Sequence, residues 1–509
     1  MSQRPSYYDP THESAPEPLE VDVCVYGGTS AGVMAAVDAS RQGLKVVLVA
    51  PEHHLGGMSA GGLGWTDFGR KHVIGGLAAE FYRRVGTHYG EHEPVWHFEP
   101  RVAEAVFEAL VAEADVPVYR GRFLKTVTTD NNRIRSLETE DGLVAGARVF
   151  VDATYEGDLM AAAGITYTVG REGNRPYGEV LNGVQFREKH QFEWPVSPYR
   201  REGDATSGLL PGISSEPPSF PGSGDHRIQA YNFRLCLTRR DDIRVPFPEP
   251  EDYDPERYTL LARYLQAGWR DVFRKFDLLR NDKTDTNNHG AISTDCIGMN
   301  YDYPEANYVE REHIFQEHLR WHRGWCWFLS HDKRVPADIR NEMATWGLCA
   351  DEFVSTGGWP HQLYIREARR MVSDVVVTEH HCMGRRREPD PVALGSYNMD
   401  SHNCRRFALE GRAWNEGDVQ IPVPRPYGIP YRAIVPKARE CRNLLVPVCV
   451  SASHIAYGSV RMEPVFMALG QSAAVAAGLA MELDTAVQEV PYASIKDQLL
   501  ARRQVLTAE

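Results

Sequence analysis

The stretch VDVCVYGGTSAGVMAAVDASRQG, residues 21–43, decides the fold. Its first five residues are largely apolar, as expected of a buried parallel strand, and residues 27–32 then turn the chain. A helix rich in small residues follows, with Gly43 where a helix C-cap belongs. The segment LKVVLVA, residues 44–50, predicts a second buried strand. Together they form a β-α-β unit of the length that a dinucleotide-binding fold requires.

The glycine fingerprint of this turn is incomplete. The pattern G-x-G-x-x-G requires glycine at positions 27, 29 and 32, but the chain has Thr29 in the middle, with Gly28 beside it. Gly27 permits the tight turn, and Gly32 permits close packing of the helix on the strand. Gly28 could still admit a pyrophosphate, the Thr29 hydroxyl could donate to it, and the helix N-terminus offers free N–H groups. An ordinary β-α turn is the alternative, and the turn alone favours neither.

The second strand lacks the acidic residue that normally bonds a ribose at its end, since Ala50 stands there. Glu52 follows two residues later. It either replaces the missing acid or is a solvated loop charge, and both readings stay open at this point.

Composition narrows the class of protein. A chain of 509 residues is too long for one ordinary core, and a net charge of −13 argues against nucleic acid and anionic membrane as partners. The nine cysteines are odd in number and form no C-x-x-C pair, which argues against a disulfide framework or a zinc ribbon, and no metal site is predicted. The N-terminus shows no apolar signal region, and the apolar run 464–481 contains Gln471, as expected of an interior helix. We therefore expect a soluble cytoplasmic protein without a membrane span.

The chain divides into four segments by character. Residues 1–20 form a polar, proline-containing tail, and 21–170 carry the pattern of strands and helices just described. From 171 to 400, proline, aromatic and charged residues interleave without repeat, and in 401–509 the first pattern returns. We predict an α/β fold in which a Rossmann-like domain is assembled from both ends of the chain, with an inserted α+β substrate domain between them.

Several motifs in fixed order carry a family resemblance. After the first turn come HLGGMSAGGLGWTD from residue 54, VDATYEGDLMAAAG from 151, NNHGAISTD from 287, YIREARRM from 364, YGIPYRAIVPK from 427 and SASHIAYGSVRMEPVFMALGQSAAVAAG from 451. Together they resemble the FAD-dependent oxidoreductase family of the glutathione-reductase-like flavoproteins, over about residues 21–485. Some members of that family are catalogued as xanthan lyases.

The resemblance implies FAD as the cofactor. It implies that the pyrophosphate lies on the first turn, that the flavin follows residues 56–62, that adenine meets Phe123, and that the C-terminal segment lies against the pyrimidine end of the flavin. The residues expected to contact FAD are Gly27, Gly28, Thr29, Ser30, Ala31, Gly32, Glu52, Gly56, Gly57, Met58, Ser59, Gly61, Gly62, Phe123, Thr154, Asp158, Arg461, Met462, Gly470 and Gln471.

The C-terminal motif also has a physical argument for this position. Pro464 suits the first turn of a helix, and a helix N-terminus at flavin N1 and O2, assisted by Arg461, would stabilise the charge of reduced flavin. Core packing is the plainer role for this helix, and the two roles are compatible. His53 and His54 stand where distant flavoproteins attach FAD covalently, but two loop histidines are more often solvated.

Oxidation of a C–H bond by flavin requires a base for the departing hydroxyl or amine proton, and histidine titrates in the right range. His454 is the first candidate because it precedes the flavin-facing segment, and His402 and His289 follow. A structural histidine is the alternative at each position. For the substrate we single out Tyr457 and Arg366, although Arg366 could equally pair with Glu367 or another carboxylate.

These observations predict an FAD-dependent oxidoreductase that dehydrogenates a small polar substrate, a sugar or other hydroxyl compound, by hydride transfer to flavin N5. Oxygen or another molecule would accept the electrons. A flavin monooxygenase, or a lyase or isomerase that uses flavin as a transient redox partner, are the alternatives, and a non-catalytic flavin-binding module is a third. The chain shows no separate NAD(P)H fingerprint, which disfavours the monooxygenase.

Overall fold

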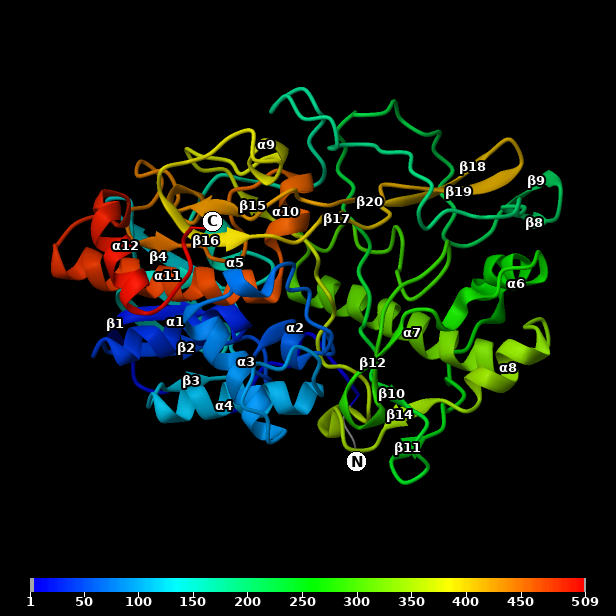
Figure 1. Ribbon diagram of the computed structural model, residues 1–509, viewed down its shortest axis with the longest axis horizontal. Helices are drawn as coiled ribbons and strands as arrows, with labels where there is room; N and C mark the ends of the chain where they lie inside the picture. Colours follow the sequence, from blue (N-terminus) through cyan, green and yellow to red (C-terminus); the bar gives the residue numbers. More distant parts are fainter. Residues whose placement is uncertain (1–3, 508–509) are drawn as a thin grey trace.

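The computed structural model describes residues 4–507. Two regions lie side by side (Figure 1): one combines the N-terminal and C-terminal parts of the chain, and the other contains most of the middle part. This arrangement agrees with the predicted assembly of a Rossmann-like domain from both ends.

The first region is built on a seven-stranded sheet in the order β3-β2-β1-β6-β5-β4, with β22 paired to β6. The strands β3, β2, β1, β6 and β22 run parallel, and β4, β5 and β6 form an antiparallel meander. Residues Val23–Tyr26 of β1 are fully buried because both neighbouring strands flank them, α1 packs on one face, and the β4–β5 meander with α5 packs on the other. The strands are β1 (Leu19–Tyr26), β2 (Val46–Val49), β3 (Val118–Tyr119), β4 (Leu124–Asp130), β5 (Arg133–Thr139), β6 (Val144–Asp152) and β22 (Leu444–Leu445).

Two helices from opposite ends of the sequence pack on this sheet and on each other. An ideal Cβ at Gly470 would lie 2.2 Å from the Ala31 carbonyl oxygen, so glycine is what allows α1 and α11 to approach closely. Among the described residues α11 alone is long and apolar enough to cross a membrane, and 83% of that apolar stretch is buried inside the molecule. The helices of this region are α1 (Ser30–Arg41), α2 (Gly57–Ala60), α3 (Gly76–His88), α4 (Pro100–Glu113), α5 (Asp158–Ala162), α9 (Glu379–Cys382), α10 (His454–Val460), α11 (Glu463–Glu482) and α12 (Tyr492–Ala501).

The second region is a mixture of helices and small antiparallel sheets around α7, whose N-terminus is closed by a capping box between Asn307 and Glu310. Its helices are α6 (Thr259–Gln266), α7 (Tyr308–His331) and α8 (Ala337–Met343). Its strands are β8 (Tyr199–Arg201), β9 (Asp204–Leu209), β10 (Leu237–Thr238), β11 (Arg244–Val245), β12 (Phe276–Leu278), β13 (Thr284–Thr286) and β14 (Gly347–Cys349).

Further short strand pairs complete the fold. The pairs are β7 (Tyr167–Thr168) with β15 (Arg370–Met371), β16 (Pro391–Gly395) with β21 (Tyr427–Pro430), β17 (Met399–Ser401) with β20 (Val419–Ile421), and β18 (Arg405–Leu409) with β19 (Arg412–Glu416). In Figure 1 the β18–β19 hairpin extends toward β8 and β9, and Phe407 bridges to Ser214. The second region thus continues past residue 400, where we had expected the inserted domain to end.

Candidate functional site

The glycine turn after β1 has the conformation that a phosphate-binding turn requires. Gly27 has φ +110°, and an ideal Cβ at Gly32 would lie 1.9 Å from the Gly27 carbonyl oxygen. No larger residue fits at position 32 without moving α1 off the strand. The N–H groups of Ser30 and Ala31, in the first turn of α1, have no acceptors within the helix, so this part of the turn can present donors to an anion.

Thr29 fills the middle position in a way that the sequence did not indicate. Its Oγ1 donates to the Ala153 carbonyl oxygen at 2.6 Å and accepts from the Gly32 N–H at 3.3 Å, so Thr29 is the N-cap of α1. The expectation that this hydroxyl could donate to a phosphate is wrong, because its proton is already used inside the protein. Threonine at this position adds a cap to α1 and a link to Ala153, directly after β6.

Glu52 lies over the same turn. Its Oε2 accepts from the Gly28 N–H at 2.9 Å, although the two residues are 24 positions apart. Glu52 and Phe123 both line a cavity of about 440 Å³ that begins beside the turn. The acid absent at Ala50 therefore has a counterpart in space. The cavity joins Glu52, the open candidate for the ribose, to Phe123, which the resemblance implied for adenine.

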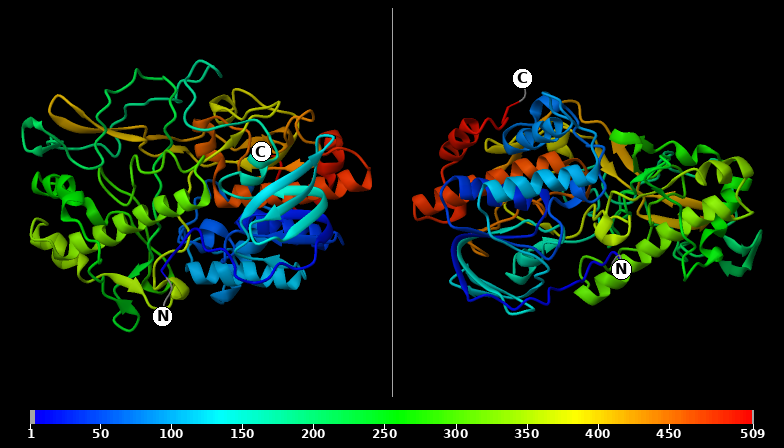
Figure 2. Two further views of the ribbon diagram at one scale, coloured as in Figure 1. Left: turned by 180° about the vertical axis from the view of Figure 1, so that it is seen from behind. Right: turned by 90° about the horizontal axis from the view of Figure 1, so that it is seen from below.

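The N-terminal segment forms one wall of this cavity. Figure 2 shows it running from β1 toward α7, and Tyr7, Asp9 and Thr11 are among the lining residues. The backbone N–H groups of Tyr7 and Tyr8 donate to one Glu312 oxygen at 2.7 and 2.9 Å. The Tyr8 ring meets the edge of Phe123 with 4.9 Å between centroids. The expected tail is irregular up to β1, and its described part supplies one wall of the cavity.

His53 and His54 line the same cavity, and both have protein partners. The His53 Nε2 lies 2.7 Å from the Asp9 carbonyl oxygen. The His54 Nδ1 lies 2.6 Å from Glu104, and its Nε2 lies 3.1 Å from the Ser355 hydroxyl. These contacts account for both histidines without a covalent bond to a cofactor.

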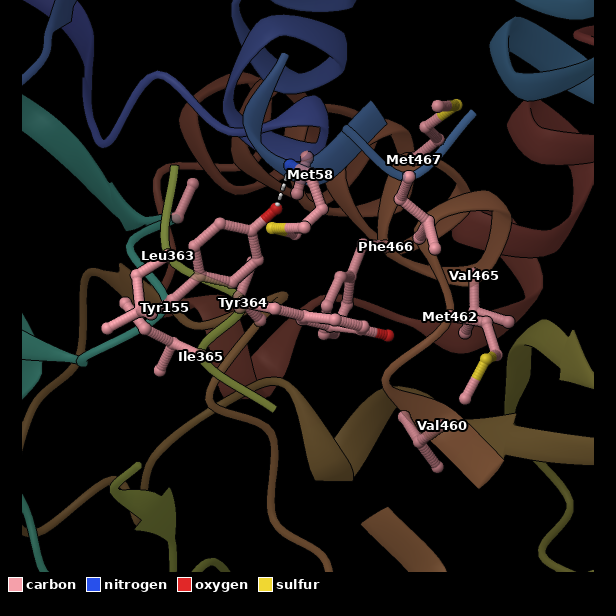
Figure 3. Close-up of a cluster of buried hydrophobic side chains, with 14 of the residues drawn as sticks. Met58, Tyr155, Leu363, Tyr364, Ile365, Val460, Met462, Val465, Phe466 and Met467 are labelled. Carbon is pink, nitrogen blue, oxygen red and sulfur yellow. Dashed lines mark hydrogen bonds between the residues drawn. The ribbon is translucent and has the colours of Figure 1, made fainter. Parts of the chain in front are cut away.

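The segments that the resemblance assigned to the flavin converge at one place. Figure 3 shows Met58, Tyr155, Tyr364 and Phe466 gathered there, from four separate segments. The Met58 N–H donates to the Tyr155 hydroxyl at 2.8 Å, and that hydroxyl donates to Glu463 at 2.7 Å. The glycine-rich segment is thus tied to the first residue of α11 through one tyrosine.

Glu463 is the polar centre of this convergence, and sequence reasoning missed it. The side chain is buried, and its Oε2 and the Ser30 hydroxyl both lack hydrogen-bond partners among residues 4–507. Burial raises the pKa of Glu463 to about 7, against smaller opposing effects of Ser30, Tyr155 and Ser59. Its position directly before Pro464 at a helix start was the only signal available.

The glycines of the segment 56–62 are each required by a protein neighbour. Ideal Cβ atoms at Gly56, Gly57, Gly61 and Gly62 would lie 2.1 to 2.4 Å from Phe107, Tyr155, Gln362 and Arg234, respectively. The resemblance had placed the flavin along this glycine-rich segment. Close packing of α2 against α4 and the second region explains the glycines directly.

Four further residues expected at FAD are engaged elsewhere. Thr154 donates to Asp152, and Asp158 is held by Arg311 and Arg369 from outside the sheet, which lower its pKa against the opposing effect of burial. The Gln471 side chain bonds the Leu77 N–H and Asp38, and Gly470 packs on α1. These contacts give Thr154, Asp158, Gly470 and Gln471 structural roles. Met462 is the N-cap of α11 and is buried in the cluster of Figure 3.

A second cavity, of about 690 Å³, lies at the junction of the two regions. Residues 65–70, which continue directly from the glycine-rich segment, form one wall. The charged and imidazole side chains that line it are Asp67, Arg70, Lys189, His190, Arg234, Arg274, Lys275, Asp277, His289, Asp400 and His402. We call this the polar cavity.

His402 is the best-oriented histidine of the polar cavity. Its Nδ1 lies 2.7 Å from Asp295 Oδ2, and its Nε2 lies 3.5 Å from Asp400 Oδ2, which also lines the cavity. Burial and the nearby Arg366 lower the pKa of His402, but Asp295 and Asp400 together outweigh them, so the pKa lies above its ordinary value. The Asp295 carboxylate fixes the orientation of the ring, as in other histidine–carboxylate pairs.

The other two candidate histidines are less suited to accept a proton from a substrate. His289 lines the polar cavity, but burial and the neighbouring His190 lower its pKa to about 4, which makes it a weak base. His454 is buried outside the lining, with Nδ1 2.8 Å from Glu367 and Nε2 3.0 Å from the Ser401 hydroxyl. Both its nitrogens are occupied, so the geometry gives His454 the structural role and favours His402.

Neither expected substrate residue reaches the polar cavity. The Tyr457 hydroxyl is buried and donates to the Val448 carbonyl oxygen at 3.1 Å. Arg366 is buried and pairs with a carboxylate, as the alternative had suggested, but the partner is Asp295 at 2.9 Å and not Glu367. Arg366 therefore acts behind the His402–Asp295 pair.

Arg461 lies between the convergence of Figure 3 and the polar cavity. Its Nη1 donates to the Tyr364 hydroxyl at 2.7 Å, and its Nη2 lies 3.3 Å from Asp400 Oδ2. Arg461 thus links the convergence of Figure 3 to the wall of the polar cavity.

The residues present fit FAD. Three features follow one another along the carboxyl end of the sheet. They are the close approach at Gly27 and Gly32, the two orphaned polar atoms of Ser30 and Glu463, and the cavity between Glu52 and Phe123. A dinucleotide with a polyol chain offers partners of matching chemistry to each.

Comparison with known proteins gives one extended match. The family model described as FAD dependent oxidoreductase matches residues 22–499. No curated protein matches the chain. Among solved structures, L-proline dehydrogenase from P. horikoshii is 15% identical, with 31% of this chain and 59% of that chain covered and a TM-score of 0.23. L-amino acid deaminase from Proteus vulgaris is 15% identical, with 35% and 60% covered and a TM-score of 0.26.

A third solved structure, 3-ketosteroid-delta4-(5alpha)-dehydrogenase from Rhodococcus jostii RHA1, is 15% identical, with 32% and 51% covered and a TM-score of 0.20. The chain thus spans about half to three fifths of the length of these structures. Similarity at this level carries no conclusion about the site.

Proposed function

Because the chain belongs to the FAD-dependent oxidoreductase family, we propose that it dehydrogenates a hydroxyl-bearing polar molecule, of the sugar or sugar-derived class, in the polar cavity with His402 as the base. The FAD-dependent oxidoreductase activity and the FAD cofactor follow from the family. The substrate class, the proton acceptor and the placement within the glutathione-reductase-like flavoproteins are the proposal. The His402–Asp295 pair at the wall of the polar cavity is the observation that carries it.

FAD, when bound, supplies a two-electron acceptor for the hydride of a C–H bond. On this chain the turn Gly27–Gly32 would hold the pyrophosphate, Glu52 the ribose, and Phe123 with Tyr8 the adenine. Glu463 and Ser30, whose polar atoms are orphaned, would bond the polyol chain. The protonated form of Glu463, favoured by its raised pKa, can donate a hydrogen bond and does not repel phosphate.

The lining of the polar cavity supports a polar, hydroxyl-rich substrate. Asp67 and Asp400 offer acceptors for hydroxyl groups, and Arg70, Lys189 and Arg274 supply donors at its wall. Trp65 adds an aromatic surface on the side of the glycine-rich segment. A purely apolar substrate would leave these charged groups desolvated without partners.

His402 would take the hydroxyl proton of the substrate at Nε2. Asp295 bonds the opposite nitrogen and stabilises the imidazolium that results. Arg366, paired with the other oxygen of Asp295, holds that carboxylate in place. The base must be neutral before it can accept the proton, so the rate should rise with pH through a pKa above the ordinary value for histidine.

The proposal is tested by an anaerobic screen of sugars, polyols and hydroxy acids against the purified FAD-loaded protein, with flavin absorbance as the readout. A substrate should bleach the flavin and yield the carbonyl product. Bleaching by apolar alcohols or by amines only would contradict the substrate class. Incorporation of oxygen into the product in air would point to the monooxygenase alternative, and an isomerised product without net bleaching would point to a lyase or isomerase. The cytoplasmic location is likewise a proposal, tested by fractionation.

A further inference from the structure

A third cavity, of about 210 Å³, lies in the second region behind the His402–Asp295 pair. Most of its wall is apolar, and the apolar lining residues include Leu260, Leu261, Ile292, Ile297, Met299 and Trp321. We call it the Arg406 cavity, because one buried guanidinium stands in this apolar wall.

Arg406 is buried, with 7% of its surface exposed. No carboxylate lies within ion-pair distance of it among residues 4–507. Its Nε donates to Asn415 at 3.0 Å, and its Nη2 donates to the Ala291 carbonyl oxygen at 2.7 Å. Both contacts are to neutral groups, so they orient the guanidinium but do not balance its charge. A buried cation without a counter-ion is costly in a folded protein.

The remaining nitrogen of Arg406 faces the cavity. Nη1 forms no hydrogen bond within the described residues, and an ideal Cβ at Gly212, which lines the cavity, would lie 3.8 Å from it. The glycine leaves the approach to Nη1 open. The other arginine of the wall, Arg257, is already paired with Glu317 at 2.6 Å.

Asp295 separates this cavity from the polar cavity. Asp295 also lines the Arg406 cavity, but one of its oxygens bonds His402 and the other lies 2.9 Å from Arg366, so both oxygens already have cationic neighbours. The charge of Asp295 is thereby balanced on its own side. The positive charge of Arg406 is the one that a ligand in this cavity would meet.

We propose that the Arg406 cavity binds a small organic carboxylate whose apolar body lies among the apolar lining residues and whose anion pairs with Arg406. The volume suits one six-membered ring with a carboxylate, since a cavity of about 150 Å³ lined by apolar side chains already holds benzene. The site is separate from the cofactor and the proposed substrate, and it stands or falls independently of the proposed function.

The test is calorimetric titration of the FAD-loaded protein with benzoate, and with benzyl alcohol as a neutral molecule of similar shape. Benzoate should bind at one site, about tenfold or more tighter than benzyl alcohol, because a hydrogen-bonded charge is lost in the alcohol. Arg406→Met should weaken benzoate about tenfold to hundredfold and leave benzyl alcohol unchanged, whereas Arg406→Lys should retain the preference for the anion.

Two further variants keep the test decisive if Arg406→Met does not fold. Met299→Trp, at a half-buried position of the wall, should fill the cavity and abolish binding of both molecules. Arg70→Met, in the polar cavity, should leave benzoate binding unchanged. Equal affinity for benzoate and benzyl alcohol would overturn the proposal. So would benzoate binding that survives Met299→Trp or is abolished by Arg70→Met.

Discussion

The cavity beside the glycine turn and the polar cavity are built from opposite kinds of contact. The first is formed around one β-α turn, with Gly28 and Glu52 only 24 residues apart, and the N-terminal segment closes over it. The second is formed where distant segments meet, and its central pair, Asp295 and His402, is 107 residues apart. Binding chemistry here depends on a local motif, whereas the proposed catalytic chemistry depends on how the second region packs on the first.

The largest effect of a substitution is expected at the glycine turn after β1. Gly32→Val should abolish FAD binding, because the first atom of any side chain at position 32 already collides with the Gly27 carbonyl. Flavin absorbance after purification and gel filtration measures this. Gly43→Ala is the matched control, because a Cβ there meets no atom within 4 Å, although its φ of +80° costs some stability. Normal FAD loading of Gly32→Val would contradict the role of the glycine turn in FAD binding.

The next largest effect is expected at the pair of Asp295 and His402 beside the polar cavity. Asp295→Asn removes a carboxylate that raises the pKa of His402, so the pH at which flavin reduction becomes fast should move downward. Because the remaining base is weaker and less well oriented, the rate at high pH should fall about tenfold to hundredfold. Asp277→Asn, in the same cavity but paired with Lys275, should leave the pH profile in place. An unshifted profile in Asp295→Asn would remove Asp295 from the mechanism.

A third prediction concerns the stability of the apoprotein and the junction at Glu463. Its pKa is raised by burial to about 7, so its contribution to stability is fully present below the pKa of the unfolded chain and is lost as pH rises toward 7. Glu463→Gln stays neutral and should therefore be more stable than wild type by on the order of 3 kcal/mol at pH 8, and by little at pH 5. Urea unfolding at both values measures this. Glu482→Gln, exposed at the other end of α11, should show no such difference, and an equal gain at both pH values would contradict the assignment.

The smallest effect is expected at Thr29. Thr29→Gly loses the hydrogen bond to Ala153 and the cap of α1, so the free energy of unfolding should fall by about 1 kcal/mol while FAD remains bound. Thr29→Ser keeps both contacts and should resemble wild type. Loss of FAD from a folded Thr29→Gly protein would mean that the hydroxyl contacts the cofactor after all.

The sequence predicted the parts of the fold that neighbouring residues determine. The β-α-β unit and the buried α11 follow from periodicity, turn residues and small side chains. The same reasoning gave His454 precedence because it precedes α11 in the chain. Its two partners, Glu367 and Ser401, come from other segments, and no local pattern indicates that they occupy both ring nitrogens.

Glu463 and Asp295 were missed for a related reason. Each lies inside a motif that the sequence singled out, but their roles arise from Tyr155 in one case and from His402 and Arg366 in the other. The glycine pattern was visible in the sequence, but it had more than one possible explanation. The glycines of segment 56–62 suggested a ligand, whereas the structure shows that protein side chains and backbone require them.

The central claim is that His402, and not His454, accepts the substrate proton. Anaerobic stopped-flow measurement of flavin reduction, with a substrate from the proposed screen, tests it directly in His402→Asn and His454→Asn. The account predicts that both variants bind FAD, that His402→Asn reduces its flavin about 10²–10⁴-fold more slowly than wild type and loses the rise with pH, and that His454→Asn stays within a fewfold of wild type. A His402→Asn protein that reduces its flavin at the wild-type rate, with the pH profile unchanged, would contradict it.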